Sequence, residues 1–579
     1  MLRQLVSKLM DEVNPKDLLA HVERLSECDR FQASRGIQRA AAYVADVASR
    51  IGLESVLVEQ FPADGKPHWW SYKAPVSWTP TKAQLLVALQ DSIPLEIDHV
   101  ARPMSLATYS APTPICGVTA TLVNVHAGTL LSKVRGTIAV LSNPTNIWLK
   151  QIAAAGAVGF IAAFDESEER SRRIELEPDS SIFGFSVTNR ELAVLRRAAE
   201  GGAVARVSIE VDRGASTPVV TGVLPGSARS NEIWVTAHLC HPRPGANDNA
   251  SGVAAALGIA AALRRNRSRT AYKSIRFVFG PEFVGVAAIM HGFVTNRCDL
   301  PDSVINLDMV GENQSLCGGP FIVERSPFLT SHINALAEAV VDEVFRFRSS
   351  AHEKWDSVPF TGFSDHALFA GPAFATPAVH LCHNFDRFNH SSADSLDKVS
   401  ADELVRSAVA GASIAYLLTN TDALPKTLLA QLVEQWHIRE AMATERIAER
   451  YHREQDGRWS REFKEFSANR AGFGSGTSPQ ILPIGVDVEP ILKARWQGPF
   501  NTRAMIEDMS PSTAHLVSDL VAEDKRTLSL LLNFAIRING RRSRQQVIKE
   551  TSFGLGRPIA HDKAQRLMDA MVECSWVSE

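Results

Sequence analysis

The sequence predicts an α/β protein in which a mixed β-sheet is flanked by helices. Between residues 216 and 424, short apolar or β-branched segments, typical of buried strands, alternate with segments of helical periodicity. Strands that alternate with helices along a chain favour a sheet covered on both faces by those helices. The predicted strands are 232–237, 274–279, 303–308 and 378–381, and the predicted helices are 250–265, 286–295 and 329–345.

The N-terminal residues extend this prediction. Residues 16–50 carry apolar side chains at helical spacing, and residues 57–61 have the composition of a strand. The first residues form a predicted amphipathic helix. Lys8, Asp11 and Glu12 lie where a signal peptide would need an apolar core, so we expect none at this end.

Composition narrows the class of protein. A chain of 579 residues exceeds one ordinary core, so we expect about three domains. The net charge of −3 argues against a general binder of nucleic acid or anionic membranes. The longest apolar stretches, 152–164 and 252–263, are shorter than the roughly 20 residues of a membrane span. The seven cysteines are an odd number and form no C-x-x-C pair, which argues against a disulfide framework, so we expect the cytoplasm as the compartment.

Residues 106–215 have the pattern of a separate small module. Residues 136–143 are predicted to form a strand, 147–155 a helix and 156–164 a buried strand. This succession is a β-α-β unit. We therefore expect a module inserted into the larger domain.

The composition changes after about residue 425. Residues 428–466 are long, charged and helical, and 472–480 have the composition of a flexible linker. Ser543, followed three residues later by Gln546, predicts a capping box at the start of one of the last helices. The helices predicted in the final part are 514–523, 528–538, 544–550 and 560–574.

The segment 237–252 (AHLCHPRPGANDNASG) carries the strongest chemical signal. His238 ends a predicted strand, where a parallel sheet places its ligands, and Asp248 lies in a loop just before a helix. Imidazole and carboxylate together suit zinc. The simpler alternative is that Asp248 caps the helix beside a surface histidine.

Three further segments end a predicted strand with a polar residue. They place Glu282 in GPEFVG, Asp308 in NLDMVG, and His390 in FNHSSADSLDKV, four residues before Asp394. The simpler alternatives are a surface glutamate, a buried hydrogen-bonded carboxylate and a loop histidine. A charge inside an apolar strand is costly unless it is paired or bound to a metal, so Asp308 is the strongest of the three.

In this order, the residues resemble the zinc-dependent aminopeptidase family that includes the bacterial secreted leucine aminopeptidases and the animal glutaminyl cyclases. The family pattern is a His, a metal-bridging Asp in a G-A-N-D-N-x-S-G loop, a Glu-Glu pair, an Asp after N-L-D and a late His. The corresponding residues in this sequence are His238, Asp248, Glu282, Asp308 and His390. The resemblance implies a zinc-exopeptidase-like fold, with His238, Asp248, Asp308 and His390 as metal ligands.

The resemblance also implies the domain organisation. Residues 1–105 and 216–424 correspond to the catalytic domain, and 106–215 resemble the protease-associated domain that often occurs in these enzymes. Residues 425–513 form a helical segment and linker. Residues 514–579 resemble a winged helix, as in a related bacterial group that shares the motifs HLCHP and PEFVG.

The sequence departs from the family pattern at two positions. Relatives have a carboxylate two residues after the first ligand, where this chain has Cys240. The Glu-Glu pair is replaced by Pro281, Glu282 and Phe283, and Gly285 lies at the distance that the family keeps from its first Glu. Glu282 therefore corresponds to the general base, and Phe283 has replaced a metal ligand.

The loss of that ligand leaves the number of zinc ions open. One set of ligands is complete, but the other keeps only Asp248 and His390, unless His241 or His383 takes the vacant position. The resemblance therefore implies one or two zinc ions.

The predicted function is a metal-dependent hydrolase, aminopeptidase or amidohydrolase, that cleaves a peptide or amide bond with a metal-activated water and Glu282 as general base. The alternative is a non-catalytic or acyl-transferring, cyclase-like member of the fold that acts as a binding scaffold. We expect a small peptide or amide substrate, no membrane, and a homo-oligomer or protein partner through the C-terminal domain. Nucleic acid is not expected, because residues 541–579 hold seven basic and five acidic residues, too balanced for a phosphate-binding surface.

Overall fold

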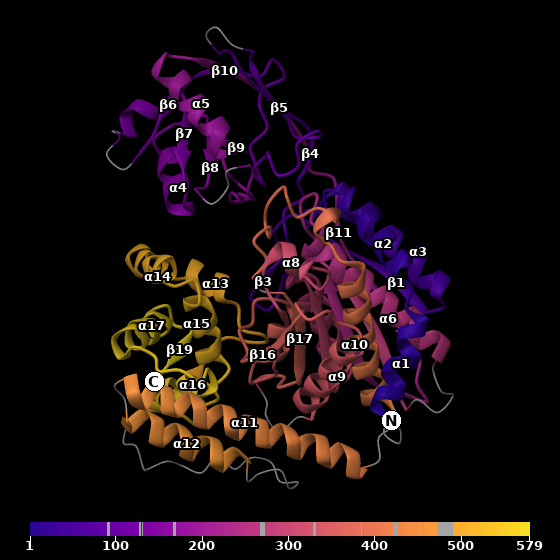
Figure 1. The fold of residues 1–579 in the computed structure, drawn as a ribbon. Coiled ribbons are helices and arrows are strands. Elements are labelled where there is room, and N and C mark those ends of the chain that lie inside the picture. The colour runs from indigo at the N-terminus through magenta and orange to yellow at the C-terminus, as the bar shows by residue number, and fades with distance from the viewer. Residues whose placement is uncertain are drawn as a thin grey trace.

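The computed structural model describes the chain except for residues 90–92, 127–128, 130, 166–168, 267–271, 328–331, 384, 421–425, 455–456 and 472–489. The predicted linker at 472–480 lies outside the described residues. Two large sheets and a C-terminal helical body make up the molecule (Figure 1).

The first sheet is mixed and has eight strands within the described residues, in the order β1-β11-β13-β12-β14-β17-β15-β16. Its centre, from β13 to β17, is parallel, whereas β1, β11 and β15 add antiparallel pairs. The predicted mixed α/β fold is thus confirmed, and the four predicted strands all lie in this sheet. The strands are β1 (Glu54–Phe61), β11 (Thr217–Leu224), β12 (Ala228–His238), β13 (Lys273–Gly280), β14 (Ser303–Asp308), β15 (Phe321–Glu324), β16 (Trp355–Val358) and β17 (Ala378–Cys382).

Helices cover one face of this central sheet. Because side chains alternate along a strand, every second one, such as Val235, Leu307 and Leu381, points toward these helices and joins a continuous apolar core. This burial explains the near-continuous apolar runs in the central strands. The helices are α1 (Leu2–Glu12), α2 (Pro15–Ser26), α3 (Arg35–Ile51), α6 (Gly252–Asn266), α9 (Ile333–Phe347) and α10 (Ala401–Thr419).

The opposite face changes from apolar to polar along the strands. Trp234 and Val304 contribute to an apolar cluster at its start, whereas His238 and Asp308, on the same face, stand at the strand ends. Parallel strands end at the same edge, so these polar side chains meet there. The elements over this face or beside the edge are α7 (Val284–Thr295), η3 (Asp365–Phe369), η2 (Ala246–Ser251), α8 (Gln314–Cys317), η4 (Leu396–Lys398), β2 (His68–Trp69) and β3 (Tyr72–Lys73).

The second sheet and the helices packed on it form a separate module with its own apolar core (Figure 1), called the second-sheet module below. The β7-α4-β8 unit has the predicted β-α-β form, with its two strands paired in parallel. The predicted N-terminal boundary at residue 105 lies too late, because β4 and β5 belong to this second sheet. The elements, in sheet order, are β5 (Leu95–Asp98), β4 (Thr79–Val87), β10 (Val204–Asp212), β6 (Val118–Asn124), β7 (Ile138–Ser142), β8 (Gly159–Ala163) and β9 (Phe183–Ser186), with η1 (Leu131–Val134), α4 (Asn146–Ala154) and α5 (Asn189–Glu200).

The C-terminal region is helical. The stretch predicted as one long helix is divided into α11 (Lys426–Glu454) and α12 (Gly457–Ala471), which pack side by side (Figure 1). The predicted capping box is present, since Ser543 and Gln546 each accept the other's backbone N–H. No helix in the described part of the chain is long and apolar enough to cross a membrane. The remaining elements are β18 (Lys493–Ala494), α13 (Thr502–Glu507), α14 (Pro511–Glu523), α15 (Thr527–Ala535), α16 (Arg544–Gly554), α17 (His561–Glu573) and β19 (Val577–Ser578).

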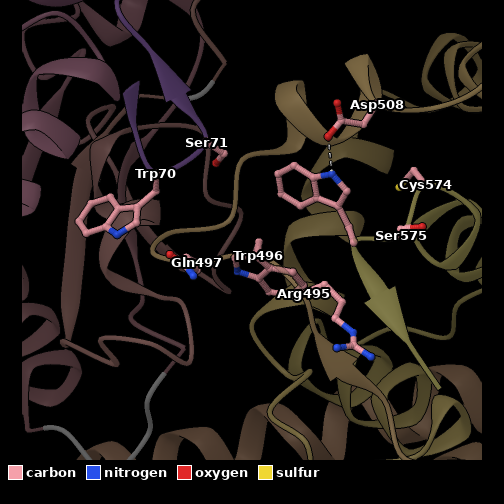
Figure 2. Close-up of a pocket in the computed structure, with 9 residues that line it drawn as sticks. Trp70, Ser71, Arg495, Trp496, Gln497, Asp508, Cys574 and Ser575 are labelled. Carbon is pink, nitrogen blue, oxygen red and sulfur yellow. Dashed lines mark hydrogen bonds between the residues drawn. The ribbon is translucent and has the colours of Figure 1, made fainter. Parts of the chain in front are cut away.

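The C-terminal body is docked against the central domain. The Tyr72 hydroxyl donates to the Phe500 carbonyl at 2.8 Å, and Asn533 Nδ2 donates to the Phe360 carbonyl at 3.1 Å. A cavity of about 410 Å³ remains between the two parts, with Trp70 on one side and Trp496 on the other (Figure 2). The contacts fix the body at one position beside the polar strand ends.

Candidate metal centre

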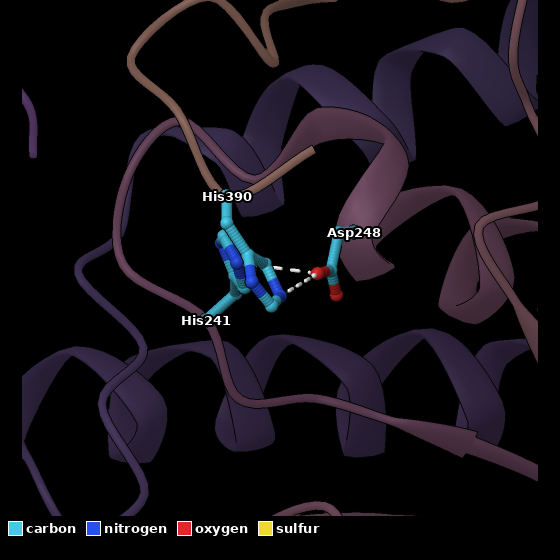
Figure 3. Close-up of side chains that lie close together, drawn as sticks. All are labelled: His241, Asp248 and His390. Atoms are coloured by element: carbon cyan, nitrogen blue, oxygen red, sulfur yellow. Dashed lines mark ion pairs between the residues drawn. The ribbon is translucent and has the colours of Figure 1, made fainter. Parts of the chain in front are cut away.

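Asp248 lies at the centre of the cluster formed by the sequence-predicted residues. Its Oδ1 lies 3.3 Å from His238 Nε2, which is also 3.1 Å from Asp308 Oδ1. Its Oδ2 lies 3.1 Å from His390 Nε2 and 3.3 Å from His241 Nε2 (Figure 3). Within each of these two groups, the potential ligand atoms lie within 4.8 Å of one another. The two oxygens of one carboxylate thus face two different sets of donors.

The histidines present the nitrogen that a metal would need. His238 Nδ1 donates to the Cys240 carbonyl at 3.0 Å, and His241 Nδ1 donates to the Pro242 carbonyl at 2.8 Å. These bonds leave Nε2 of each ring directed at Asp248. A backbone acceptor that fixes the tautomer is the usual support of a metal-binding histidine.

Of the two histidines considered for the position that Phe283 vacates, His241 is the one that lies beside Asp248. The backbone N–H groups of Arg30 and His241 each donate to the other's carbonyl, at 2.9 and 2.8 Å. The buried Arg30 guanidinium also donates to the carbonyls of Leu239 and Gly245, both at 2.9 Å. Arg30 thus holds the loop that carries His241 against the centre. The sequence left this choice open, because nothing local distinguishes His241 from a loop histidine.

His383, the other candidate, lies in a different buried group. Its Nε2 is 3.2 Å from Glu403 Oε1, and its Nδ1 is 3.9 Å from Glu312 Oε2. Both carboxylates are fully buried. His383 therefore belongs to an internal ion-pair group and not to the candidate metal centre.

Glu312 in this group provides a test of stability against pH. Burial raises its pKa to about 7, and His383 acts in the opposite direction. A carboxyl whose folded pKa is raised stabilises the fold below its unfolded pKa, and this stability is lost as the pH rises from about 4.5 to about 7. Glu312→Gln stays neutral and should raise the free energy of unfolding at pH 8, by at most about 3 kcal/mol, but not at pH 4. Denaturant unfolding at both pH values measures this difference, with Glu59→Gln on the exposed strand β1 as control. An equal change at both pH values would contradict it.

The loop of Asp248 is held by buried polar side chains. Asp394 Oδ1 accepts the N–H of Asn247 at 2.7 Å, and its Oδ2 accepts the N–H of Asp248 at 3.1 Å. Asn249 Oδ1 accepts the N–H groups of Gly252 and Met309, both at 3.0 Å. The motif residues around Asp248 therefore link its loop to the ends of neighbouring strands.

The second-sheet module holds the loop of His390. The N–H of Arg173 donates to the His390 carbonyl at 2.8 Å, and the N–H of Ser392 donates to the Ser171 carbonyl at 2.9 Å. His390 itself has a φ of 55° and is the one half-exposed histidine of the two groups. A non-glycine residue in this conformation is held there by its surroundings. The module thus orients a candidate ligand.

Glu282 lies between the end of β13 and the start of α7. Its N–H donates to Cys240 Sγ at 3.2 Å, and the N–H of Phe283 donates to Asp365 Oδ1 at 2.5 Å. Burial raises the pKa of Glu282 to about 7; His238 opposes this rise, and the carboxylates of Asp308 and Asp248 add to it. Phe283 packs among apolar side chains. Cys240, at the position where relatives have a carboxylate, thus supports the backbone of Glu282.

The donor set fits a cation. Burial lowers the pKa of His241 to about 4, so its ring is neutral at pH 7. With Nδ1–H bonded to the Pro242 carbonyl, Nε2 presents a lone pair to Asp248 Oδ2, and this buried atom has no hydrogen-bond partner. Two acceptors 3.3 Å apart repel unless a cation lies between them. The ligand types, imidazole and carboxylate, are those that zinc takes.

Comparisons with known proteins find similarity to peptidases. Residues 219–415 match the model of a family described as peptidase family M28. A Clostridium acetobutylicum protein, provisionally described as a polysaccharide biosynthesis protein with an aminopeptidase-like domain, is 30% identical over 194 residues. That match covers 33% of this chain and 40% of the relative, so the chain spans well under two thirds of its length.

Two solved structures share the fold. The zinc aminopeptidase BSAP of Bacillus subtilis superposes with a TM-score of 0.52 at 19% identity, over 71% of this chain and 97% of that one. A Clostridium acetobutylicum protein, provisionally described as a peptidase, superposes with a TM-score of 0.54 at 14% identity. This second likeness covers 99% of this chain and 98% of that one, so it extends through the C-terminal body.

Proposed function

Because residues 219–415 match the model of peptidase family M28, we propose that this protein is a zinc-dependent, aminopeptidase-like hydrolase that cleaves a peptide or amide bond. The observation that carries the proposal is the pair of facing acceptors, neutral His241 Nε2 and Asp248 Oδ2. They are stable together when a cation separates them. Asp248 would then bridge two ions.

Each of the two groups would supply the ligands of one zinc ion. His238, Asp248 and Asp308 would hold one zinc ion, and His241, Asp248 and His390 the other. Three protein ligands for each ion leave a position for substrate or water, as in catalytic zinc sites. When bound, zinc acts as a Lewis acid that polarises a carbonyl and lowers the pKa of water.

Glu282 would move the proton. Its carboxylate takes a proton from the attacking water and passes it to the nitrogen of the leaving amine. A raised pKa suits this role, because a base must accept the proton and release it within one reaction. Asp365 and Cys240 hold the backbone on either side of Glu282 and so fix its position.

A non-catalytic scaffold or a cyclase-like acyl transferase is not favoured. A scaffold has no need to bury two carboxylates and two histidines together, since unpaired polar groups destabilise a fold. Every ligand of both groups is present, and the base position is occupied as well. The residues therefore support hydrolysis.

Domain identity, partners and location extend the proposal. We propose that the second-sheet module is protease-associated-like and that α13–α17 with β18 and β19 form a winged-helix-like body. Arg542 pairs with Glu550, and Arg544 with Glu579, which favours contacts of the C-terminal body with protein, including a second copy, over contacts with phosphate.

We propose the cytoplasm as the location of the protein, because all seven cysteines are free thiols.

Removal of metal tests the proposed function. Protein treated with a chelator should lose hydrolysis of aminoacyl amides, and zinc should restore it as up to two equivalents bind to the centre. The substrate panel includes N-acylated amino sugars, because the Clostridium relative is described as a polysaccharide biosynthesis protein. Metal content and turnover are measured on the same samples. Unchanged turnover in metal-free protein would refute the proposal.

A further inference from the structure

A second group of buried histidines lies on the same sheet face as the candidate metal centre. Glu324 on β15 stands opposite His380 on β17 in the antiparallel register, and His366 comes from η3 above them. His380 also pairs with Asn306, two residues before Asp308 on β14. The group therefore lies two residues closer to the start of β14 than Asp308 of the candidate metal centre.

The three side chains are placed as a ligand set. One ligand atom from each lies within 4.8 Å of the others. His366 Nε2 is 2.7 Å from Glu324 Oε1, and His380 Nδ1 is 3.5 Å from Glu324 Oε2. The two imidazole rings stack with centroids 4.4 Å apart. Glu324 and His366 are 0% exposed and His380 is 3% exposed, so water does not reach them freely.

Three of the four ring nitrogens of this group have no hydrogen-bond partner. His366 Nδ1 has no hydrogen-bond partner, and neither nitrogen of His380 reaches hydrogen-bond geometry. His380 Nδ1 lies 3.5 Å from Glu324 Oε2, and the thiol of Cys382, two residues along the same strand face, also interacts with the His380 ring. Buried polar atoms in native proteins are almost always satisfied, and those that are not usually face an ion or a water.

The surroundings of Glu324 match those of a ligating carboxylate. Its Oε1 accepts the N–H groups of Thr361 and Gly362 at 2.6 and 2.8 Å, and its Oε2 accepts the Thr361 hydroxyl at 2.5 Å. Such bonds fix the orientation of a ligand and keep the carboxylate ionised. One buried negative charge and two imidazoles then favour a cation among them.

We propose that Glu324, His366 and His380 bind a structural zinc ion that is distinct from the candidate metal centre. Imidazole and carboxylate are zinc ligands, and complete burial is typical of a structural rather than a catalytic site. When Nε2 of the neutral His366 ring binds the ion, the N–H proton that this nitrogen shares with Glu324 moves to Nδ1 of the same ring, so the imidazole stays neutral and its Nε2 lone pair becomes free for the metal.

This ion would clamp the segment that supports the base. Thr361, Gly362 and His366 lie in one segment with Asp365, which accepts the N–H of Phe283. The clamp joins that segment to β15 and β17. Glu282, the residue before Phe283, would lose its fixed position when the ion is removed.

Zinc counting tests the proposal, first in a variant that leaves Glu324, His366 and His380 unaltered. In a variant with Asp248→Asn, His238→Gln and His390→Gln, which removes ligands of the candidate centre, folded protein should still bind one equivalent of zinc. Adding His366→Gln and His380→Gln should reduce this to none, whereas adding His352→Gln, at an exposed position, should leave one. A folded centre-ligand variant that binds no zinc overturns the inference.

Cobalt substitution gives a second readout, which starts from the wild-type protein and then needs only one single-residue variant. Wild-type protein loaded with Co²⁺ should bind one more equivalent than the candidate centre accounts for, with the visible absorption of a low-coordinate site. His380→Gln alone should remove that equivalent and lower the melting temperature, because an ion that binds only the folded state stabilises it. If His380→Gln retains every equivalent, the proposal is wrong. Failure of the proposed function would appear separately, as absent turnover with this zinc still bound.

Discussion

Glu282→Gln should lower kcat about 10²–10⁴-fold, the usual contribution of a general base, and leave zinc content unchanged. Glutamine keeps the size and polarity of glutamate but cannot accept a proton. Cys240 and Asp365 accept the backbone N–H groups of Glu282 and Phe283, and these two bonds do not involve the side chain that is substituted. Turnover of an aminoacyl amide and metal analysis of the same preparation measure the two quantities.

The pH profile separates a base from a residue that only shapes the site. A base works when it is deprotonated, so wild-type kcat/KM should fall as the pH drops through the pKa of Glu282. Burial raises this pKa to about 7, and a bound zinc ion draws it lower. Glu282→Gln should remove this acid limb, whereas Glu59→Gln should retain it. Loss of zinc from Glu282→Gln would make Glu282 a ligand, and unchanged turnover would place the base elsewhere.

Asp248→Asn should remove both zinc ions from the candidate centre and reduce hydrolysis to the uncatalysed background. The reason is geometric, since Oδ1 faces His238 and Asp308 while Oδ2 faces His241 and His390. The amide of asparagine supplies one oxygen in place of two and carries no charge. Metal analysis should therefore show two equivalents fewer than in wild type.

His241→Gln is the matched control, because His241 belongs to only one of the two groups. It should lose a single equivalent and keep the ion held by His238 and Asp308. If Asp248→Asn retains both ions, Asp248 does not bridge, and the two groups would have to be interpreted as ion pairs. If His241→Gln loses none, the position vacated by Phe283 is empty.

Several features of the fold could be predicted from sequence, because they follow from local periodicity. Strand β14 coincides with the predicted segment 303–308, since apolar and β-branched residues flanked by polar ones define a buried strand. The short strands β15 and β16 were missed, as four residues carry too little periodicity. The start of the second-sheet module was misplaced, because β4 directly follows an irregular aromatic segment.

The sequence by itself also determined which residues stand at strand ends. His238 and Asp308 follow apolar runs, and parallel strands end at a common edge, so their meeting follows from the order of the strands. The departure at Phe283 was visible as a missing ligand type. These inferences need only neighbours along the chain and the geometry of a sheet.

Only the tertiary structure decided which histidine stands beside Asp248. His241 and His383 are equally polar residues near strand ends, and they were separated by their packing against Arg30 and Glu403 respectively. The group of Glu324 and His380 arises from an antiparallel pairing between distant strands, which no local pattern encodes. Local periodicity specifies the face on which a side chain lies, whereas the convergence of side chains depends on which strands become neighbours and on the path of the loops between them.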